Sequence, residues 1–279
     1  MTIGLFHSVS EECSKVVTVR YSTSFSSAIK LLHKDLRTPI FNIYGMVRFA
    51  DEIVDTFHQH DKRALLDRFK SETFEAIDRG ISLNPILNSF QQTVRHYGID
   101  LELIHAFFRS MESDLVRERY EEVEYEKYIY GSAEVVGLMC LHVFCGDDKR
   151  LYEKLKLPAR ALGAAFQKVN FLRDMKGDHD ELSRMYFPGC DFDSFSDSDK
   201  MRIEKEIEDD FKYALAGVFQ LPLKARFGVY VAYKYYYSLF SKIKTSAPER
   251  ILQQRIRISN YQKAFIVLRA TVKNSLRLI

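Results

Sequence analysis

The sequence contains no tryptophan and little glycine or proline, with 12 and 6 residues respectively in a chain of 279. Because glycine and proline interrupt regular elements, their scarcity favours long helices over many short strands. Cysteine is also scarce, and no two cysteines form a Cys-x-x-Cys pair. This pattern is typical of buried free thiols in a reducing compartment rather than of disulfides or a zinc site. The four cysteines are Cys13, Cys140, Cys145 and Cys190.

The chain also lacks the basic-then-apolar pattern of a secretory leader at its N-terminus. Its longest clean apolar stretch, residues 135–146, is too short to cross a bilayer. The net charge of +3 is nearly neutral for this length, so it does not indicate binding to nucleic acid. We therefore expect a soluble cytoplasmic protein.

Positive charge is concentrated at the C-terminal end. From Lys242 to Ile279 there are nine Lys or Arg residues and one Glu. One explanation is a solvated basic face on the last helices. The other is attraction to phosphorylated substrate or to anionic lipid, which would hold the protein peripherally at the inner face of a membrane.

Apolar residues recur at helical spacing through most of the chain, and strand signals are weak. The segment 38–55 begins with Thr38 as the expected N-cap and a proline in the first turn. The segment 84–98 repeats this pattern with Asn84 at its start and a glycine at its end. Further helices are predicted at 99–120, 125–144, 157–178, 200–219 and 221–243.

Linkers rich in glycine, proline or serine are absent. The nearest candidate, residues 187–199, is a polar loop of ordinary length. We therefore predict one all-α domain over residues 1–279, a bundle of roughly ten helices. The sequence predicts no particular oligomeric state.

An Asp-x-x-x-Asp pair occurs at Asp51 and Asp55 and again at Asp174 and Asp178. At about 100° per residue, both aspartates of the first pair fall within the broad apolar face of their helix, on either side of Tyr44. Two carboxylates one turn apart repel each other by a few tenths of a kcal/mol on an exposed helix. Turning them inward increases the cost unless a cation is present.

The second pair belongs to a polar column on another helix. Gln167, Asn170, Asp174 and Asp178 follow one another at one helical turn per step, with Arg173 on the flank. The second helix therefore has an aspartate pair like that of the first helix, and its two amide side chains add further oxygen atoms.

Two arrangements could offset the repulsion. Arg48 and Arg173 could form salt bridges within a solvated groove, or a divalent cation could bind. Mg²⁺, or Mn²⁺ in its place, takes hard oxygen ligands and usually also binds phosphate oxygens of a substrate. Two copies of the pair favour the metal, and they predict a cavity with phosphate near its mouth and apolar surface below. The predicted metal ligands are Asp51, Asp55, Asn170, Asp174 and Asp178.

Four segments match a known family pattern in order: YSTSFSSAIKLL (21–32), YGMVRFADEIVD (44–55), YIYGSAEVVGLM (128–139) and QKVNFLRDMKGDHDELSRMYFP (167–188). The chain resembles the squalene/phytoene synthases, head-to-head prenyl transferases of the isoprenoid synthase fold, and is most like the bacterial phytoene synthases. One departure is Gly177, where the family usually has Glu. Because Asp174 and Asp178 are retained, we expect metal binding to persist, with greater local flexibility.

The resemblance implies a Mg²⁺-dependent reaction of carotenoid biosynthesis. Two geranylgeranyl diphosphates condense to a cyclopropyl (prephytoene) diphosphate, which rearranges to phytoene with release of diphosphate. The implied catalytic residues are Asp51, Asp55, Asp174, Asp178, Tyr44, Tyr128 and Tyr130. The implied substrate-binding residues are Ser22, Ser24, Phe25, Arg48, Gln167, Asn170, Arg173, Arg184 and Tyr235. The aromatic residues among them are candidates to stabilise carbocations through their ring faces.

Small side chains near the expected cavity favour a long substrate. Ile29, one turn below Phe25, is modest in size, and residues 131–133 are small. This favours C20 substrates, for which no NADPH is expected. The alternative is squalene or dehydrosqualene synthesis from two farnesyl diphosphates, of which squalene synthesis requires NADPH.

Two further classes are less well supported. Glu102 and His105 fit the Glu-x-x-His pattern of di-iron bundles, but such sites need two copies and two further glutamates. A non-enzymatic helical scaffold that binds membranes through its basic end would explain the cations but not the inward aspartates.

Overall fold

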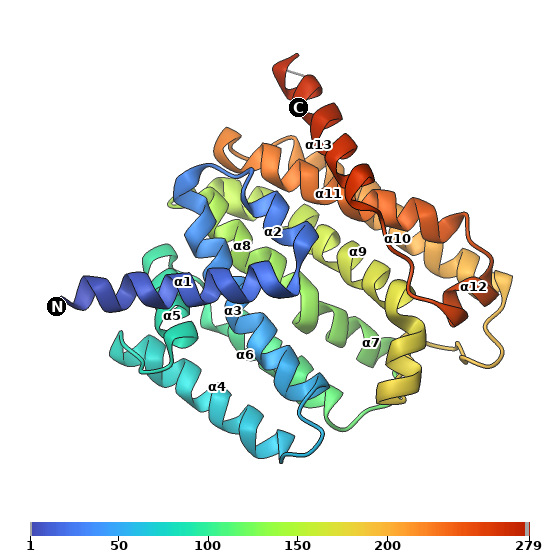
Figure 1. Ribbon diagram of the computed structural model, residues 1–279, viewed down its shortest axis with the longest axis horizontal. Coiled ribbons are helices and arrows are strands. Elements are labelled where there is room, and N and C mark those ends of the chain that lie inside the picture. Colours follow the sequence, from blue (N-terminus) through green and yellow to red (C-terminus); the bar gives the residue numbers. More distant parts are fainter. Residues whose placement is uncertain (1, 277–278) are drawn as a thin grey trace.

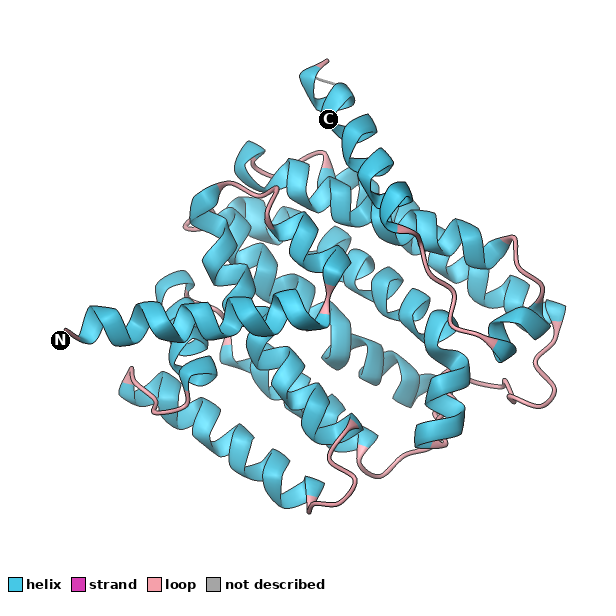
Figure 2. Cartoon of the chain, viewed as in Figure 1, coloured by secondary structure: helices cyan, strands magenta, loops and turns pink. Residues whose placement is uncertain are grey.

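The computed structural model describes residues 2–276 and Ile279, and the regular elements of this part of the chain are all helical (Figure 2). An isolated bridge joins Arg119 and Met185. The all-α prediction is therefore confirmed. The elements are α1 (Ile3–Tyr21), α2 (Thr23–Ile29), α3 (Lys34–Asp55), α4 (Lys62–Arg79), α5 (Pro85–Tyr97), α6 (Leu101–Asp114), α7 (Glu122–Ile129), the π-helical turn η1 (Tyr130–Glu134), α8 (Val135–Cys145), α9 (Lys149–Leu182), α10 (Asp197–Val218), α11 (Leu223–Lys244), α12 (Pro248–Gln253) and α13 (Asn260–Ser275).

The predicted start of α3 at Thr38 is wrong. The helix begins four residues earlier, and Pro39 lies inside it. The backbone N–H of His33, the residue before the helix, donates to the carbonyl of Lys224 at 2.9 Å, which anchors the chain at that point. Proline removes one backbone donor, but the remaining helical hydrogen bonds continue on both sides of it.

The predicted limits of α5 are confirmed. Asn84 Oδ1 accepts a hydrogen bond from the backbone N–H of Ile86 at 3.1 Å, and Pro85 occupies the first turn. Gly98 ends the helix with φ of 59°, a left-handed conformation that glycine adopts without a Cβ penalty.

The central helices surround a common space. Figure 1 shows α9 running through the middle of the molecule, with α3 and α8 on one side and α10 and α11 on the other. α1 lies across α3 and α5, and α13 packs against α11.

Close backbone approaches fix η1 between its neighbours. A Cβ built on Gly163 of α9 would lie 2.6 Å from the carbonyl oxygen of Ala133, and one on Gly131 would lie 2.5 Å from that of Ala106. Both distances are too short for a side chain, so these glycines allow η1 to contact α9 and α6 directly.

The segment from α7 to α8 is continuous over Glu122–Cys145. By length and composition this one stretch of the described chain could cross a membrane, although 56% of its most apolar window is buried inside the protein. It is longer than the clean apolar run at 135–146 because the helical segment begins thirteen residues before that run.

Candidate active site

A cavity of about 460 Å³ lies between the central helices. Its lining residues come mostly from α2, α3, α6, the α7–α8 segment, α9, α10 and α11, with Tyr21 at the end of α1 and Arg255 after α12. One end is acidic and polar, lined by Asp51, Asp55, Asp114, Asn170, Asp174 and Asp178. The other end is apolar, lined by Leu32, Ile40, Phe144, Leu155 and Leu221.

The spacing of lining residues along single helices gives the depth of the cavity. On α3, eleven residues separate Ile40 from Asp51, which corresponds to about 16 Å at about 1.5 Å per residue. On α9, nineteen residues separate Leu155 from Asp174, or about 28 Å. The cavity is therefore a deep channel with its charged groups at one end.

The first aspartate pair is only partly neutralised. Asp55 accepts a hydrogen bond from Arg184 Nη1 at 2.8 Å. The nearest cation to Asp51 is Arg48, at 3.9 Å, and Arg48 bonds more closely to Glu52. Burial raises the pKa of Asp51 to about 8, and the negative charge of Asp55 adds to the rise.

The second pair shows the same asymmetry. Arg173 binds both oxygens of Asp174, at 2.9 and 2.5 Å, and Arg255 Nε reaches the same carboxylate at 2.6 Å. Asp178 has no ion pair with any described residue. Burial raises the pKa of Asp178 to about 8, and the negative charges of Asp174 and of Asp55 on the opposite helix add to the rise. The two pairs therefore face each other across the acidic end.

Asp114 at the end of α6 also belongs to this site, and the sequence reasoning missed it. Its carboxylate accepts hydrogen bonds from the hydroxyls of Tyr128 at 2.6 Å and Tyr120 at 2.8 Å. Burial raises its pKa to about 6, while Arg184 and the Tyr128 hydroxyl oppose the rise. The one sequence signal was an acid at a helix C-terminus, where the helix dipole disfavours negative charge.

Arg184 connects the two aspartate pairs. Its backbone N–H donates to the carbonyl of Asp178 at 2.9 Å, and its guanidinium donates to Asp55 and to the carbonyl of Asp114, each at 2.8 Å. The sequence predicted that Arg184 holds phosphate. In the structure its side chain is only 6% exposed and bonds to protein oxygens, so it positions the carboxylates.

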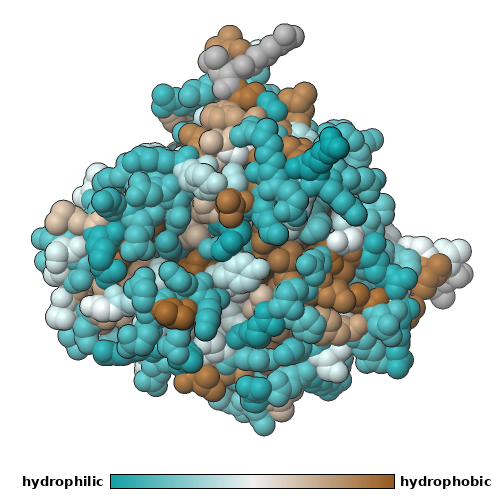
Figure 3. Space-filling view, turned by 180° about the vertical axis from the view of Figure 1, so that it is seen from behind, coloured by the Kyte–Doolittle hydropathy of each residue, from teal (hydrophilic) through white to brown (hydrophobic). Residues whose placement is uncertain are grey.

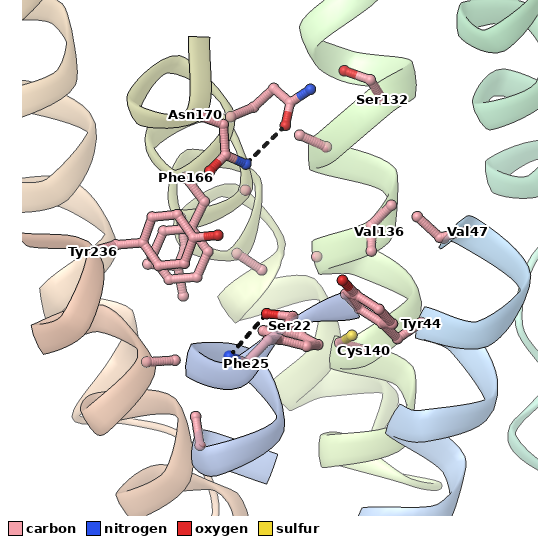
Figure 4. Close-up of a pocket in the computed structure, with 18 of the residues that line it drawn as sticks. Ser22, Phe25, Tyr44, Val47, Ser132, Val136, Cys140, Phe166, Asn170 and Tyr236 are labelled. Atoms are coloured by element: carbon pink, nitrogen blue, oxygen red, sulfur yellow. Dashed lines mark hydrogen bonds between the residues drawn. The ribbon is translucent and has the colours of Figure 1, made fainter. Parts of the chain in front are cut away.

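Aromatic pairs line the channel below the carboxylates (Figure 4). Phe25 stacks on Tyr44 with ring centroids 5.2 Å apart, and Phe166 stacks on Tyr236 at 3.9 Å. The prediction named Tyr235 in place of Tyr236. Consecutive helical residues point about 100° apart, and Tyr235 lies instead in a separate buried cluster. Ala232, one turn before Tyr236, lines the channel too, so this side of α11 faces the channel and carries Tyr236 rather than Tyr235.

The squalene/phytoene synthase family model matches residues 18–262, which is most of the chain. The protein belongs to the squalene/phytoene synthase family.

Similar proteins of this family include phytoene synthase 1 of Solanum lycopersicum, 28% identical over 263 residues. That match covers 88% of this chain and 63% of the relative. The 4,4'-diapophytoene synthase of Staphylococcus haemolyticus is 27% identical over 202 residues, which cover 67% of this chain and 65% of the relative. The matches therefore span less than two thirds of either relative.

A crystal structure described as a dehydrosqualene synthase in complex with ligand has the same fold as this family member. The TM-score is 0.83 at 17% sequence identity, with 98% of each chain covered. The predicted isoprenoid synthase fold, a helical bundle around a central cavity, is thus confirmed.

The remaining residues that the resemblance selected divide into two groups. Ser22, Gln167 and Tyr128 line the cavity, and Ser22 Oγ also accepts a hydrogen bond from Phe25 N–H at 3.2 Å (Figure 4). Ser24 and Tyr130 do not line it. The Tyr130 ring instead lies under the guanidinium of Arg160, 5.1 Å from the ring centroid, because its helix position points toward α9 outside the channel.

The acidic end has the donor chemistry of a divalent cation site. Within residues 2–276 and Ile279, no three His, Cys, Asp or Glu side chains converge as a preformed metal centre. However, Asn170 Oδ1 is buried and accepts no hydrogen bond from a described residue, and Asp51 and Asp178 lack close cations. Mg²⁺ commonly binds through a few carboxylates, waters and substrate phosphate, so a divided ligand set suits it. Gly177, the departure from the family pattern, has open space around its Cβ position.

Proposed function

We propose that the protein is a phytoene synthase that joins two geranylgeranyl diphosphates head to head, with Mg²⁺ or Mn²⁺ and without NADPH. One observation carries the proposal: in a member of this family, a deep apolar channel opens at one end into two facing aspartate pairs. An amphiphile with an anionic head and a long hydrocarbon tail matches that polarity.

Buried donors at the acidic end suit a diphosphate. Arg48 Nε and Ser132 Oγ are buried and have no partner among the described residues. Arg173 and Arg255 lie on the opposite side, where they bind Asp174. These groups would orient the diphosphate through charge-assisted hydrogen bonds.

Divalent cations held by Asp51, Asp55, Asn170, Asp174 and Asp178 would neutralise the departing diphosphate as Lewis acids. The negative charge of these four aspartates and of Asp114 around one space would otherwise repel an anionic substrate, as the high pKa values of Asp51 and Asp178 indicate.

The channel walls suit carbocation chemistry. The stacked pairs Phe25–Tyr44 and Phe166–Tyr236 present aromatic surface just below the charged end. Ring faces stabilise positive charge, and an apolar channel excludes the water that would trap a carbocation.

The proposed reaction balances without an added reductant. In the first step two carbon–carbon single bonds form, one from the electrons of a double bond and one from those of a C–H bond, as one diphosphate and one proton leave; this gives the cyclopropyl diphosphate. In the second step the other diphosphate leaves, the carbon skeleton rearranges, and loss of a proton creates the central double bond of phytoene. Reduction to a squalene-type product would instead require hydride from NADPH.

Small side chains along the channel support a C20 substrate. Ala28 of α2, Ala214 of α10 and Ala232 of α11 all line it. The second candidate is condensation of two farnesyl diphosphates to dehydrosqualene, which the staphylococcal diapophytoene synthase relative favours.

The test is a product assay. Purified protein is incubated with geranylgeranyl or farnesyl diphosphate, each with Mg²⁺ or EDTA and with or without NADPH, and the hydrocarbons are identified by mass. We expect a C40 hydrocarbon from the C20 substrate, dependent on Mg²⁺, independent of NADPH and lost in Asp51→Asn. The matched control is Asp147→Asn, which removes an exposed acid far along the sequence from both pairs. A C30 product from farnesyl diphosphate with no C40 product would overturn the assignment.

A further inference from the structure

A surface groove of about 790 Å³ lies between α11 and α13, separate from the channel in its lining residues. The outward side of α13 carries an apolar row that we name the outer stripe. Its members are between 52% and 89% exposed. The outer stripe consists of Tyr261, Phe265, Leu268, Val272 and Leu276.

Spacings of three and four residues place the outer stripe on one side of α13. The opposite side, with Ile266, Val267 and Ala270, packs against the buried cluster of α11. The outer stripe is therefore not part of the core, although surface helices normally place polar residues outward. In the space-filling view, hydrophobic side chains interrupt the hydrophilic surface where this helix projects at the top (Figure 3).

Three cations lie beside the outer stripe in the groove. Lys234 of α11 and Arg269 and Lys273 of α13 line it, and none of them has an ion-pair partner in the described part of the chain. Burial, followed by the charges of Lys273 and Arg269, lowers the pKa of Lys234. The sequence from 211 to 279 contains thirteen Lys and Arg residues but a single acid, Glu249.

We infer that α13 is a docking helix for an anionic phospholipid bilayer. The outer stripe enters the interfacial region, and Lys234, Arg269 and Lys273 bind headgroup phosphates. Apolar residues along one side of a helix with cations beside them are the features of helices that lie in a membrane interface. Each cation near an anionic leaflet adds to the attraction.

A second copy of the chain fits this surface less well. In a two-fold dimer the same patch meets itself, so the three cations of one copy would face those of the other. Neither α11 nor α13 contains an acidic residue that could pair with them. Charge complementarity therefore selects an anionic surface.

The same orientation brings the membrane near the channel. Tyr236 of α11 lines the channel, and the next residue, Tyr237, lines the groove. Docking through α13 would leave α13 and α11 between the bilayer and the channel interior.

The test measures vesicle binding without substrate. Sedimentation compares phosphatidylcholine vesicles with vesicles that also contain phosphatidylglycerol. We expect binding to the anionic vesicles only, weakened at least tenfold by Phe265→Ser with Leu268→Ser and at least tenfold by Arg269→Gln with Lys273→Gln. The apolar control is Val123→Ser, a side chain 61% exposed on α7, which should bind like the wild type.

Two results would overturn the inference. One is equal binding of the wild type and both double variants to anionic vesicles. The other concerns the double variant Phe265→Ser with Leu268→Ser. If sedimentation velocity shows that this variant has lost a dimer that the wild type forms, while its binding to vesicles is unchanged, the stripe is a dimer interface. Circular dichroism checks that the variants fold. Because no turnover is measured, failure here would leave the proposed reaction untouched.

Discussion

Replacing Asp51 by Asn should stabilise the protein in the absence of metal and abolish its activity. The carboxyl lies in the acidic end beside Asp55, with its nearest cation 3.9 Å away. Burial and this repulsion raise its pKa from 3.8 to about 8. Asparagine has nearly the same shape and no charge, so it removes the cost of holding an ionised group there.

The sign and size of this change in stability follow from the linkage between protonation and folding. A carboxyl with a raised pKa binds its proton more tightly in the folded protein, so its favourable contribution is complete below the unfolded pKa and is lost as pH rises through the folded pKa. The window is therefore from about pH 4 to pH 8. A four-unit shift corresponds to about 6 kcal/mol at most. Since 32% of the Asp51 side chain is exposed, water screens much of this, and we expect a gain of about 1–2 kcal/mol.

Thermal unfolding in EDTA between pH 5 and pH 8 measures the effect. At about 2 °C per kcal/mol for a chain of this size, the Asp51→Asn midpoint should exceed the wild type by about 2–4 °C at pH 8, with a smaller gap at pH 5. Asp147→Asn is the control for loss of one exposed charge. Mg²⁺ with inorganic diphosphate should raise the wild-type midpoint more than that of the variant. An Asp51→Asn midpoint below the wild type at pH 8 would refute the reasoning.

Three other substitutions test different parts of the site. Asp114→Ala leaves two buried tyrosine hydroxyls without their acceptor, so urea unfolding should show a loss of about 3 kcal/mol in stability. Tyr128→Phe should cost about 1 kcal/mol, and an equal loss of stability in the two variants would contradict this reasoning. Arg184→Lys replaces the two nitrogens that donate to Asp55 and to the Asp114 carbonyl by a single ammonium nitrogen, so turnover should fall at least tenfold with the fold intact by circular dichroism. Val229→Phe adds bulk in the channel and should reduce C20 turnover at least tenfold more than C15 turnover, whereas Leu223→Phe, exposed on the same helix, should change neither.

Helical periodicity predicted the acidic end well. The positions of Asp51 and Asp55 on the apolar side of their helix and the column ending at Asp178 required only the repeat of an α-helix, and the structure brings both to one cavity. The choice between Tyr235 and Tyr236 needed the rotation of α11 against its neighbours, which the five consecutive aromatic and basic residues 233–237 do not determine.

Residues that reach the site through long-range packing were not predictable from one sequence. Asp114 lies at a helix end, and its role depends on Tyr128 and Arg184, fourteen and seventy residues away along the chain. Arg255 follows α12 and is eighty-one residues from its partner Asp174. Neither belongs to a local motif, so only the folded chain reveals them.

The π-helical turn η1 makes the length of the α7–α8 segment a determinant of the site. A π-turn holds one residue more than an α-turn, so it offsets the angular phase of α8 from that of α7 by about 100°. Tyr128, before the offset, meets Asp114, while Val136 and Cys140, after it, face the channel. Deleting one residue within η1 would bring the two helices into phase and turn one of these surfaces away. Descendants of this chain can therefore exchange side chains along the segment more freely than they can change its residue count.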